Sequence, residues 1–267
     1  PPFPAAPGKE ELERQFGLDR WYVAKVAEDA DIDVAARTLA ESNKVSLVEY
    51  DIKMKLATDG LTFPYEGPVT APATRAAMSD LGFNDPLIAE QWNYYNLGDL
   101  SIASSAYAGA DINIKDTWKT LTAGDPSVIV AVVDQGVDYT HPDLVPNMWV
   151  NEAEKNGKPG VDDDGNGYVD DVHGYNFVDG EGDINYDKSQ DFDTGHGTHC
   201  AGIIGAVNNN GIGMAGVAGG TGNNDGVRIM SCQIFSKGYG GETRYSSRAI
   251  KYAADNGASV ISCSYGY

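Results

Sequence analysis

The chain has 267 residues, 42% of them hydrophobic, so it is long enough to bury a core in one large domain or two unequal ones. Its 39 acidic and 19 basic residues give a formal charge of −20, which repels phosphate backbones and argues against nucleic acid as a partner. The longest apolar run, residues 128–133, is far shorter than the roughly 20 residues that cross a bilayer, so no membrane span is expected. Three widely spaced cysteines without a CxxC pair indicate neither a disulfide framework nor a metal knuckle.

The first part of the chain predicts a small α+β module over residues 1–60. Alternation of apolar and polar residues predicts strands over 21–27 and 45–56, and a helix over 33–42 with Asp33 as its cap. Residues 61–83 are rich in glycine and proline and have little periodicity, which is typical of a linker.

Residues 84–267 predict a different architecture. Continuous apolar runs at 128–133, 227–234 and 258–263 are typical of strands buried on both faces of a parallel sheet. Helical patterns at 198–207 and 245–256 separate them, so the expected fold class is α/β, a doubly wound and mostly parallel sheet.

Two segments carry residues suited to acid-base chemistry. Asp134 follows the run at 128–133, at the strand end where sites of open α/β sheets gather. His196 lies between Gly195 and Gly197 at the start of the next predicted helix. A buried carboxylate bonded to one imidazole nitrogen leaves the other to act as a general base, so Asp134 and His196 are the candidate catalytic pair. Zinc binding by His196, His199 and Cys200 is disfavoured because no HExxH or CxxC motif accompanies them.

The sequences VVDQGVDYTHPDL and DTGHGTHCAGIIGAV, which contain this pair, resemble the aspartate and histidine blocks of the subtilisin-like serine proteases, the subtilases. NNNGIGMAGVA and GASVISCSYG extend the resemblance over nearly everything from Asn84 onward. It implies a serine endopeptidase in which Asp134 orients the general base His196. It also implies that Ser264, Tyr265 and Gly266 form the strand that pairs with an extended peptide substrate, that His199 is structural, and that Cys200 is a buried free thiol. Gln135 departs from the family pattern, which more often has threonine or serine there.

The nucleophile of that family is missing from these residues. No GTS block occurs in the sequence, and we expect the serine beyond Tyr267. A shortened chain or a proteolytic product is the favoured explanation. The alternative is a noncatalytic, calcium-dependent peptide-binding pseudoprotease.

An acidic stretch between Asn151 and Gly195 holds 13 acidic residues and 3 lysines. Within it, Asp162, Asp164, Asn166, the Tyr168 carbonyl and Asp170 follow the opening spacing of an EF-hand loop, which predicts a structural calcium site. A solvated acidic surface remains the alternative. The family resemblance suggests a second calcium site at Asp143 and Asn210, helped by carbonyls around Ile212.

The module over residues 1–60 resembles the propeptide of the same family, which blocks the active site of its own enzyme. The chain would then be a zymogen, cut during maturation between residues 57 and 84. Its partners would be its own propeptide, the missing C-terminal segment and protein or peptide substrates. The expected location is secreted, periplasmic or at the cell surface, with any signal sequence outside this chain.

Overall fold

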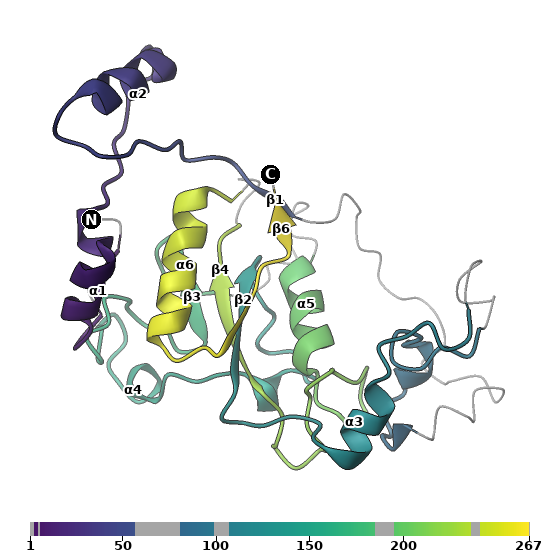
Figure 1. The fold of residues 1–267 in the computed structure, drawn as a ribbon. Coiled ribbons are helices and arrows are strands. Elements are labelled where there is room, and N and C mark those ends of the chain that lie inside the picture. Colours follow the sequence, from purple (N-terminus) through teal and green to yellow (C-terminus); the bar gives the residue numbers. More distant parts are fainter. Residues whose placement is uncertain are drawn as a thin grey trace.

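The core of the protein is a four-stranded sheet (Figure 1). The structure is a computed structural model that describes residues 3–4, 6–56, 81–98, 107–184, 195–235 and 241–266. All neighbouring strands are parallel, and their order is β3–β4–β2–β5. The strands are β2 (Ile129–Asp134), β3 (Gly174–Asn176), β4 (Arg228–Gln233) and β5 (Val260–Ser262).

Both faces of this sheet are covered. In β2, Ala131 and Val133 pack into a cluster with α6 (Thr243–Asp255), whereas Val132 packs into a second cluster that contains Ala201 of α5 (His196–Gly205). All three strand residues are fully buried. Burial of such a side chain contributes about 1.5–3 kcal/mol, so a strand that is apolar at every position is stabilised from both sides. The expected doubly wound α/β fold is confirmed.

The predicted strands at 128–133, 227–234 and 258–263 correspond to β2, β4 and β5, and the two predicted helices correspond to α5 and α6. Both helices begin two residues earlier than predicted. Strand β3 was not predicted, because its three residues have no apolar run of their own. Gly174 pairs with Ser231 of β4 so closely that a Cβ at this glycine would overlap the Ser231 carbonyl.

The N-terminal part contains α1 (Glu10–Phe16), α2 (Ile32–Glu41) and β1 (Lys55–Leu56). The predicted strand at 21–27 is wrong, because no described backbone pairs with it. Of the one predicted at 45–56, only Lys55–Leu56 form a strand, β1, and residues 52–54 pair with residues 241–243 through an isolated bridge. The cap of α2 is Asp31 rather than Asp33: its carboxylate accepts hydrogen bonds from the N–H groups of Asp33 and Val34. Neither α1 nor α2 contributes a buried residue, so these helices do not enclose a core of their own.

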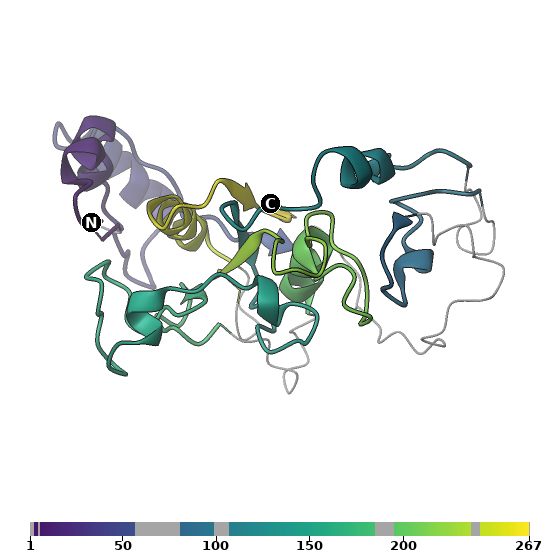
Figure 2. The ribbon, with the colours of Figure 1, turned by 90° about the horizontal axis from the view of Figure 1, so that it is seen from below.

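The predicted linker, residues 61–83, lies outside the described residues up to position 80. The chain from Leu81 packs against Ala215, in the part of the chain that contains the parallel sheet. Tyr94 is fully buried with Ala215, and its hydroxyl donates to the Ala215 carbonyl at 2.9 Å. Helix α3 (Ile114–Thr120) joins this cluster through Trp118. Figures 1 and 2 show α1 and α3 on opposite sides of the central sheet. Within the described residues, no helix has the length and apolar character needed to cross a membrane.

Candidate active site

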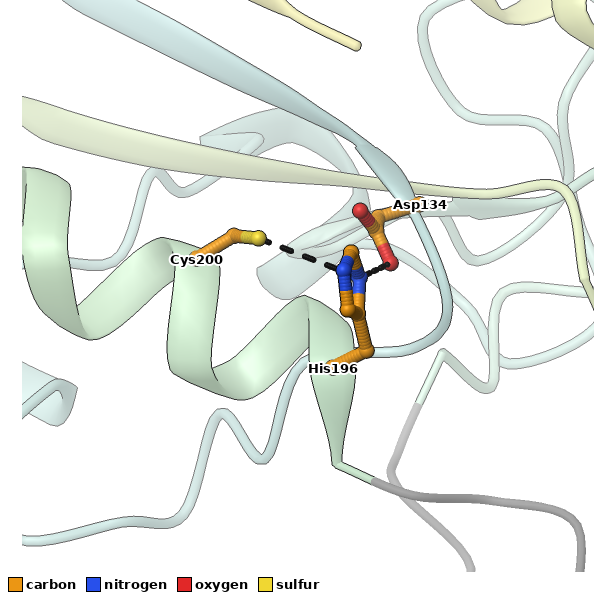
Figure 3. A group of neighbouring side chains, drawn as sticks. All are labelled: Asp134, His196 and Cys200. Carbon is orange, nitrogen blue, oxygen red and sulfur yellow. Dashed lines mark hydrogen bonds and ion pairs between the residues drawn. The ribbon is translucent and has the colours of Figure 1, made fainter. Parts of the chain in front are cut away.

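Asp134 and His196 meet at the carboxyl edge of the sheet (Figure 3). Asp134 is the last residue of β2 and His196 is the first of α5. The Asp134 Oδ1 atom lies 2.7 Å from His196 Nδ1, and the two residues are 1% and 5% exposed. The sequence predicted this pair, and the strand-end position explains why a carboxylate can reach the first turn of the following helix.

Asp134 changes the pKa of the His196 imidazole. Its hydrogen bond raises the pKa of His196 above the ordinary value, against the opposing effect of burial. Because Nδ1 is engaged by the carboxylate, Nε2 is the nitrogen left to exchange a proton with another molecule.

The loop after Asp134 fixes the position of the histidine. The backbone N–H of His196 donates to Gln135 Oε1 at 3.2 Å, so the glutamine that departs from the family pattern supports the first turn of α5. Gly197 sits so close to this loop that a Cβ would overlap the Gln135 carbonyl oxygen. Gly195 precedes the helix with a φ of 70°, a conformation that favours glycine. The two glycines that flank the histidine are therefore explained by backbone geometry.

Cys200 lies one turn along α5 from the histidine, with Sγ 3.8 Å from His196 Nδ1 (Figure 3). It is half-buried, and burial raises the pKa of its thiol, which keeps it protonated. The nearby Ser264 hydroxyl lowers the pKa of this thiol, but burial has the larger effect. His199, three residues beyond His196, is exposed.

The expected substrate strand is paired in the structure. Tyr265 and Gly266 form β6, which is antiparallel to β1 with Lys55 opposite Gly266 and Leu56 opposite Tyr265. Ser264 precedes β6 and is not part of the pair. The three predicted residues are thus brought together, and the N-terminal part of the same chain lies against two of them.

The segment over residues 52–56 also pairs on its other side. The Met54 N–H donates to the Gly241 carbonyl at 2.6 Å, and the Thr243 N–H donates to the Ile52 carbonyl at 3.0 Å. Met54 is 3% exposed and belongs to the core cluster that contains Phe235, with Tyr265 packed against it. Residues 52–56 of the chain itself therefore lie as an extended segment between residues 241–243 and β6, with the Met54 side chain inserted into the core.

The acidic loop brings three carboxylates together. Oxygens of Glu154, Asp162 and Asp164 all lie within 4.8 Å of one another. Like charges at this separation repel unless a cation lies between them, and hard oxygen donors in a glycine-bearing loop suit calcium. Two of the predicted ligands, Asp162 and Asp164, belong to this group. Glu154 was missed because it comes from α4 (Glu152–Lys155), outside the motif.

The other predicted ligands of this loop have different partners. Asp170 accepts a hydrogen bond from the Gly160 N–H at 2.8 Å, and the Asn166 amide donates to Asp164 and to Asp171. The Tyr168 side chain is buried, and its N–H donates to Asn166 Oδ1 at 2.8 Å. Asp171 is fully buried; burial raises the pKa of this carboxyl to about 7, and the Tyr252 hydroxyl donates to it at 2.6 Å.

The second predicted cluster gains a carboxylate that sequence reasoning missed. Asn210 Nδ2 donates to Asp143 Oδ1 at 2.8 Å, and the Asn210 N–H donates to Asp85 Oδ1 at 3.2 Å. Asp85 and Asp143 are each 2% exposed, and burial raises the pKa of both carboxyls. The Ile212 N–H donates to Asn210 Oδ1. The Asn210 amide thus faces Asp143 through its nitrogen, and the two buried carboxylates are hard oxygen donors of the kind that bind calcium.

Comparison with known proteins places this arrangement in a family. The family model described as "Subtilase family" matches residues 125–267. "Subtilisin-like protease 1" of Plasmodium vivax is 39% identical over 60% of this chain and 24% of its own length. "Halolysin-like extracellular serine protease Nep" of Natrialba magadii is 32% identical over 68% of this chain and 26% of its own length.

A solved structure of an Aeromonas sobria serine protease with its chaperone matches 66% of this chain and 24% of that chain, at 25% identity and a TM-score of 0.46. The chain therefore spans about a quarter of the length of these proteins. The match of the family model covers more than half of the chain and includes Asp134, His196 and β6. The chain belongs to the subtilase family.

Proposed function

We propose that the whole protein is a serine endopeptidase that cleaves peptide bonds through an Asp–His–Ser triad. The observation that carries this proposal is the buried 2.7 Å contact between Asp134 Oδ1 and His196 Nδ1. A serine outside these 267 residues would be the nucleophile. His196 Nε2 would take the serine proton as the hydroxyl attacks the scissile carbonyl and return it to the leaving amine, while Asp134 stabilises the imidazolium that forms.

The chain is proposed to be the zymogen of this enzyme. Residues 52–56 occupy the place where an extended substrate would pair with β6, and the buried Met54 anchors them there. A strand supplied by the same chain is held at a high effective concentration, so it excludes substrates until the chain is cut. Maturation would cut between residues 57 and 84, which mostly lie outside the described residues.

Calcium is proposed as a structural ion of the mature fold. Glu154, Asp162 and Asp164 would hold one ion, and Asp85, Asp143 and Asn210 a second. A bound cation would offset the repulsion within each acidic group and so stabilise the loops that carry it.

The substrates are proposed to be proteins or peptides outside the cytoplasm. The Natrialba magadii relative is named as an extracellular serine protease, and two calcium sites suit the millimolar calcium of extracellular fluids.

The test is active-site labelling of the full-length protein after its N-terminal segment has been removed. A fluorophosphonate probe reacts with an activated serine, so we expect labelling of the wild type and of His199→Ala, whose histidine is exposed on the same helix. His196→Ala should not be labelled. An unlabelled wild type that still binds peptides would support the pseudoprotease alternative instead.

A further inference from the structure

The start of α6 receives a carboxylate from the N-terminal segment. Asp51 Oδ1 accepts a hydrogen bond from the Arg244 N–H at 3.0 Å, and Asp51 Oδ2 lies 3.2 Å from Arg244 Nε. The helix has no cap of its own at this end, because the side chain of its N-cap residue, Glu242, makes no capping hydrogen bond. The carboxylate of Asp51 therefore contacts both a backbone donor of the first turn and a guanidinium.

The register of the segment is set by its backbone rather than by Asp51. Hydrogen bonds link Ile52 to Thr243, Met54 to Gly241, and the pair Lys55–Leu56 to β6. Any extended peptide can make these main-chain bonds whatever its side chains. A substrate in the same register would place the side chain three residues before its buried apolar residue at Arg244.

Arg244 is held in place independently of Asp51. Its Nη2 atom lies 2.5 Å from Glu242 Oε2 and donates to the Tyr245 hydroxyl at 3.0 Å, and the guanidinium lies 4.8 Å from the centre of the Tyr245 ring. The arginine is therefore oriented by neighbours that remain when the N-terminal segment leaves. A preorganised guanidinium loses little freedom when a carboxylate binds to it.

We propose that Arg244, with the backbone N–H at the start of α6, forms a carboxylate subsite of the mature enzyme. It selects substrates that carry Asp or Glu three residues before the apolar residue that takes the place of Met54. In the present structure Asp51 occupies the subsite as the zymogen's own ligand. This inference rests on the proposed function, because it requires β6 to be the substrate strand.

The experiment uses the processed full-length protein and two synthetic peptides that cover residues 49–58, one with Asp51 and one with Asp51→Asn. We expect kcat/KM for the Asp peptide to be about fivefold higher, the size of an ion pair that is partly exposed to water. In Arg244→Ala, the two peptides should have equal kcat/KM values. Lys119→Ala, which removes an exposed positive charge from α3, should retain the preference.

A charge-reversal variant tests the subsite even if Arg244→Ala folds poorly. Arg244→Glu should prefer a peptide with Asp51→Lys over the Asp peptide. The inference is overturned if the wild type does not discriminate the Asp and Asn peptides, or if Arg244→Ala retains the preference.

Peptide affinity for His196→Ala, measured by fluorescence anisotropy, separates the two proposals. Preferential binding of the Asp peptide without any hydrolysis by the wild type would support the subsite and contradict the endopeptidase. Hydrolysis of both peptides at equal rates would contradict only the subsite. If neither peptide binds to His196→Ala, the subsite is contradicted, whatever the outcome for the endopeptidase.

Discussion

Asp134 and His196 come from two different elements, yet Asp134 Oδ1 lies 2.7 Å from His196 Nδ1 and both side chains are almost completely buried. The end of β2 and the start of α5 are adjacent because both lie at the carboxyl edge of the parallel sheet. The contact raises the pKa of His196, so the carboxylate affects both the orientation and the protonation of the imidazole.

Replacing Asp134 with asparagine should lower the pKa of His196 and, in the active enzyme, reduce kcat by about 10⁴-fold, as expected when the orienting carboxylate of a triad is lost. The raised pKa means that the folded state favours the imidazolium. The associated stability is therefore fully present below the ordinary value of about 6.5 and is lost as pH rises through the raised folded-state value. The stability difference between wild type and Asp134→Asn should accordingly be larger at pH 5.5 than at pH 8.5.

The pKa of His196 can be followed by NMR of its ring protons. Asp138→Asn is a matched control, because this carboxylate lies in the same loop and accepts hydrogen bonds from Thr140. Equal His196 pKa values in the wild type and Asp134→Asn would contradict the interpretation of the contact.

Gly197→Ala should displace His196. A methyl group at this position would overlap the Gln135 carbonyl oxygen, and the neighbouring backbone cannot move without shifting the first turn of α5. We expect a loss of about 2–4 kcal/mol in the free energy of unfolding. Gly202→Ala is the matched control: its Cβ would meet only the Met214 sulfur at 3.8 Å, so this variant should be neutral or gain up to about 1 kcal/mol in helix stability. Urea unfolding measures both, and an equal effect of the two substitutions would contradict the steric argument.

The elements that the sequence predicted are those with a strong local signal. Strand β2 was predicted because each of its apolar residues is buried on one face or the other. The pair Asp134 and His196 was predicted because Asp134 follows an apolar run, His196 begins a predicted helix, and both lie in sequence blocks that resemble those of the subtilases. Segment 21–27 was misjudged for the opposite reason: alternation describes a surface that can pair, but a strand exists only where another backbone pairs with it.

The missed residues depend on contacts between distant parts of the chain. Asp85 reaches the loop after α5 from far upstream, and Glu154 reaches the acidic loop from a helix outside the calcium motif. Asp31 was missed as the cap of α2 because Asp31 and Asp33 both precede the apolar pattern, and only the backbone geometry distinguishes them. The pairing of β1 with β6 connects segments near the two ends of the sequence and has no local signature at all.

Calcium should raise the melting temperature of the protein, and Glu154→Gln should reduce that rise. A ligand that binds only the folded state at 100 times its Kd stabilises it by about 2.7 kcal/mol, and loss of one charged ligand weakens this effect. Differential scanning fluorimetry with calcium and with a chelator measures it.

The two possible ligand sets of the acidic loop make different predictions. Asp162→Asn should behave like Glu154→Gln, whereas Asp170→Asn should retain the calcium response, because Asp170 bonds to the Gly160 N–H and is not in the carboxylate group. Glu152→Gln, an exposed glutamate of the same helix, is the matched control. A loss of response in Asp170→Asn but not in Glu154→Gln would favour the EF-hand ligand set that the sequence predicted.

The N-terminal segment should be released more readily when Lys251 is replaced by methionine. Lys251 Nζ lies 2.6 Å from Glu13 of α1 and 2.5 Å from Asp255 of its own helix, α6, and its side chain is only 10% exposed. Figure 2 shows α1 beside α6, some distance from β1, so this ion pair is a second attachment of the segment. Loss of a partly buried ion pair costs about 1–3 kcal/mol, and amide hydrogen exchange in α1 should become correspondingly faster.

Acid should weaken the same attachment. Burial alone raises the pKa of Glu13, but hydrogen bonds from Lys251 and from the Ala6 N–H outweigh it and leave the pKa lowered. A carboxyl whose folded-state pKa is lowered contributes stability above its ordinary pKa and loses it as pH falls through the lowered value. The protection factors of the α1 amides, which correct for the slower intrinsic exchange in acid, should therefore fall at acid pH in the wild type and depend less on pH in Glu13→Gln. Arg14→Gln is the control, since Arg14 pairs only with the highly exposed Glu11 among the ion pairs described, and unchanged α1 exchange in Lys251→Met would contradict the second attachment.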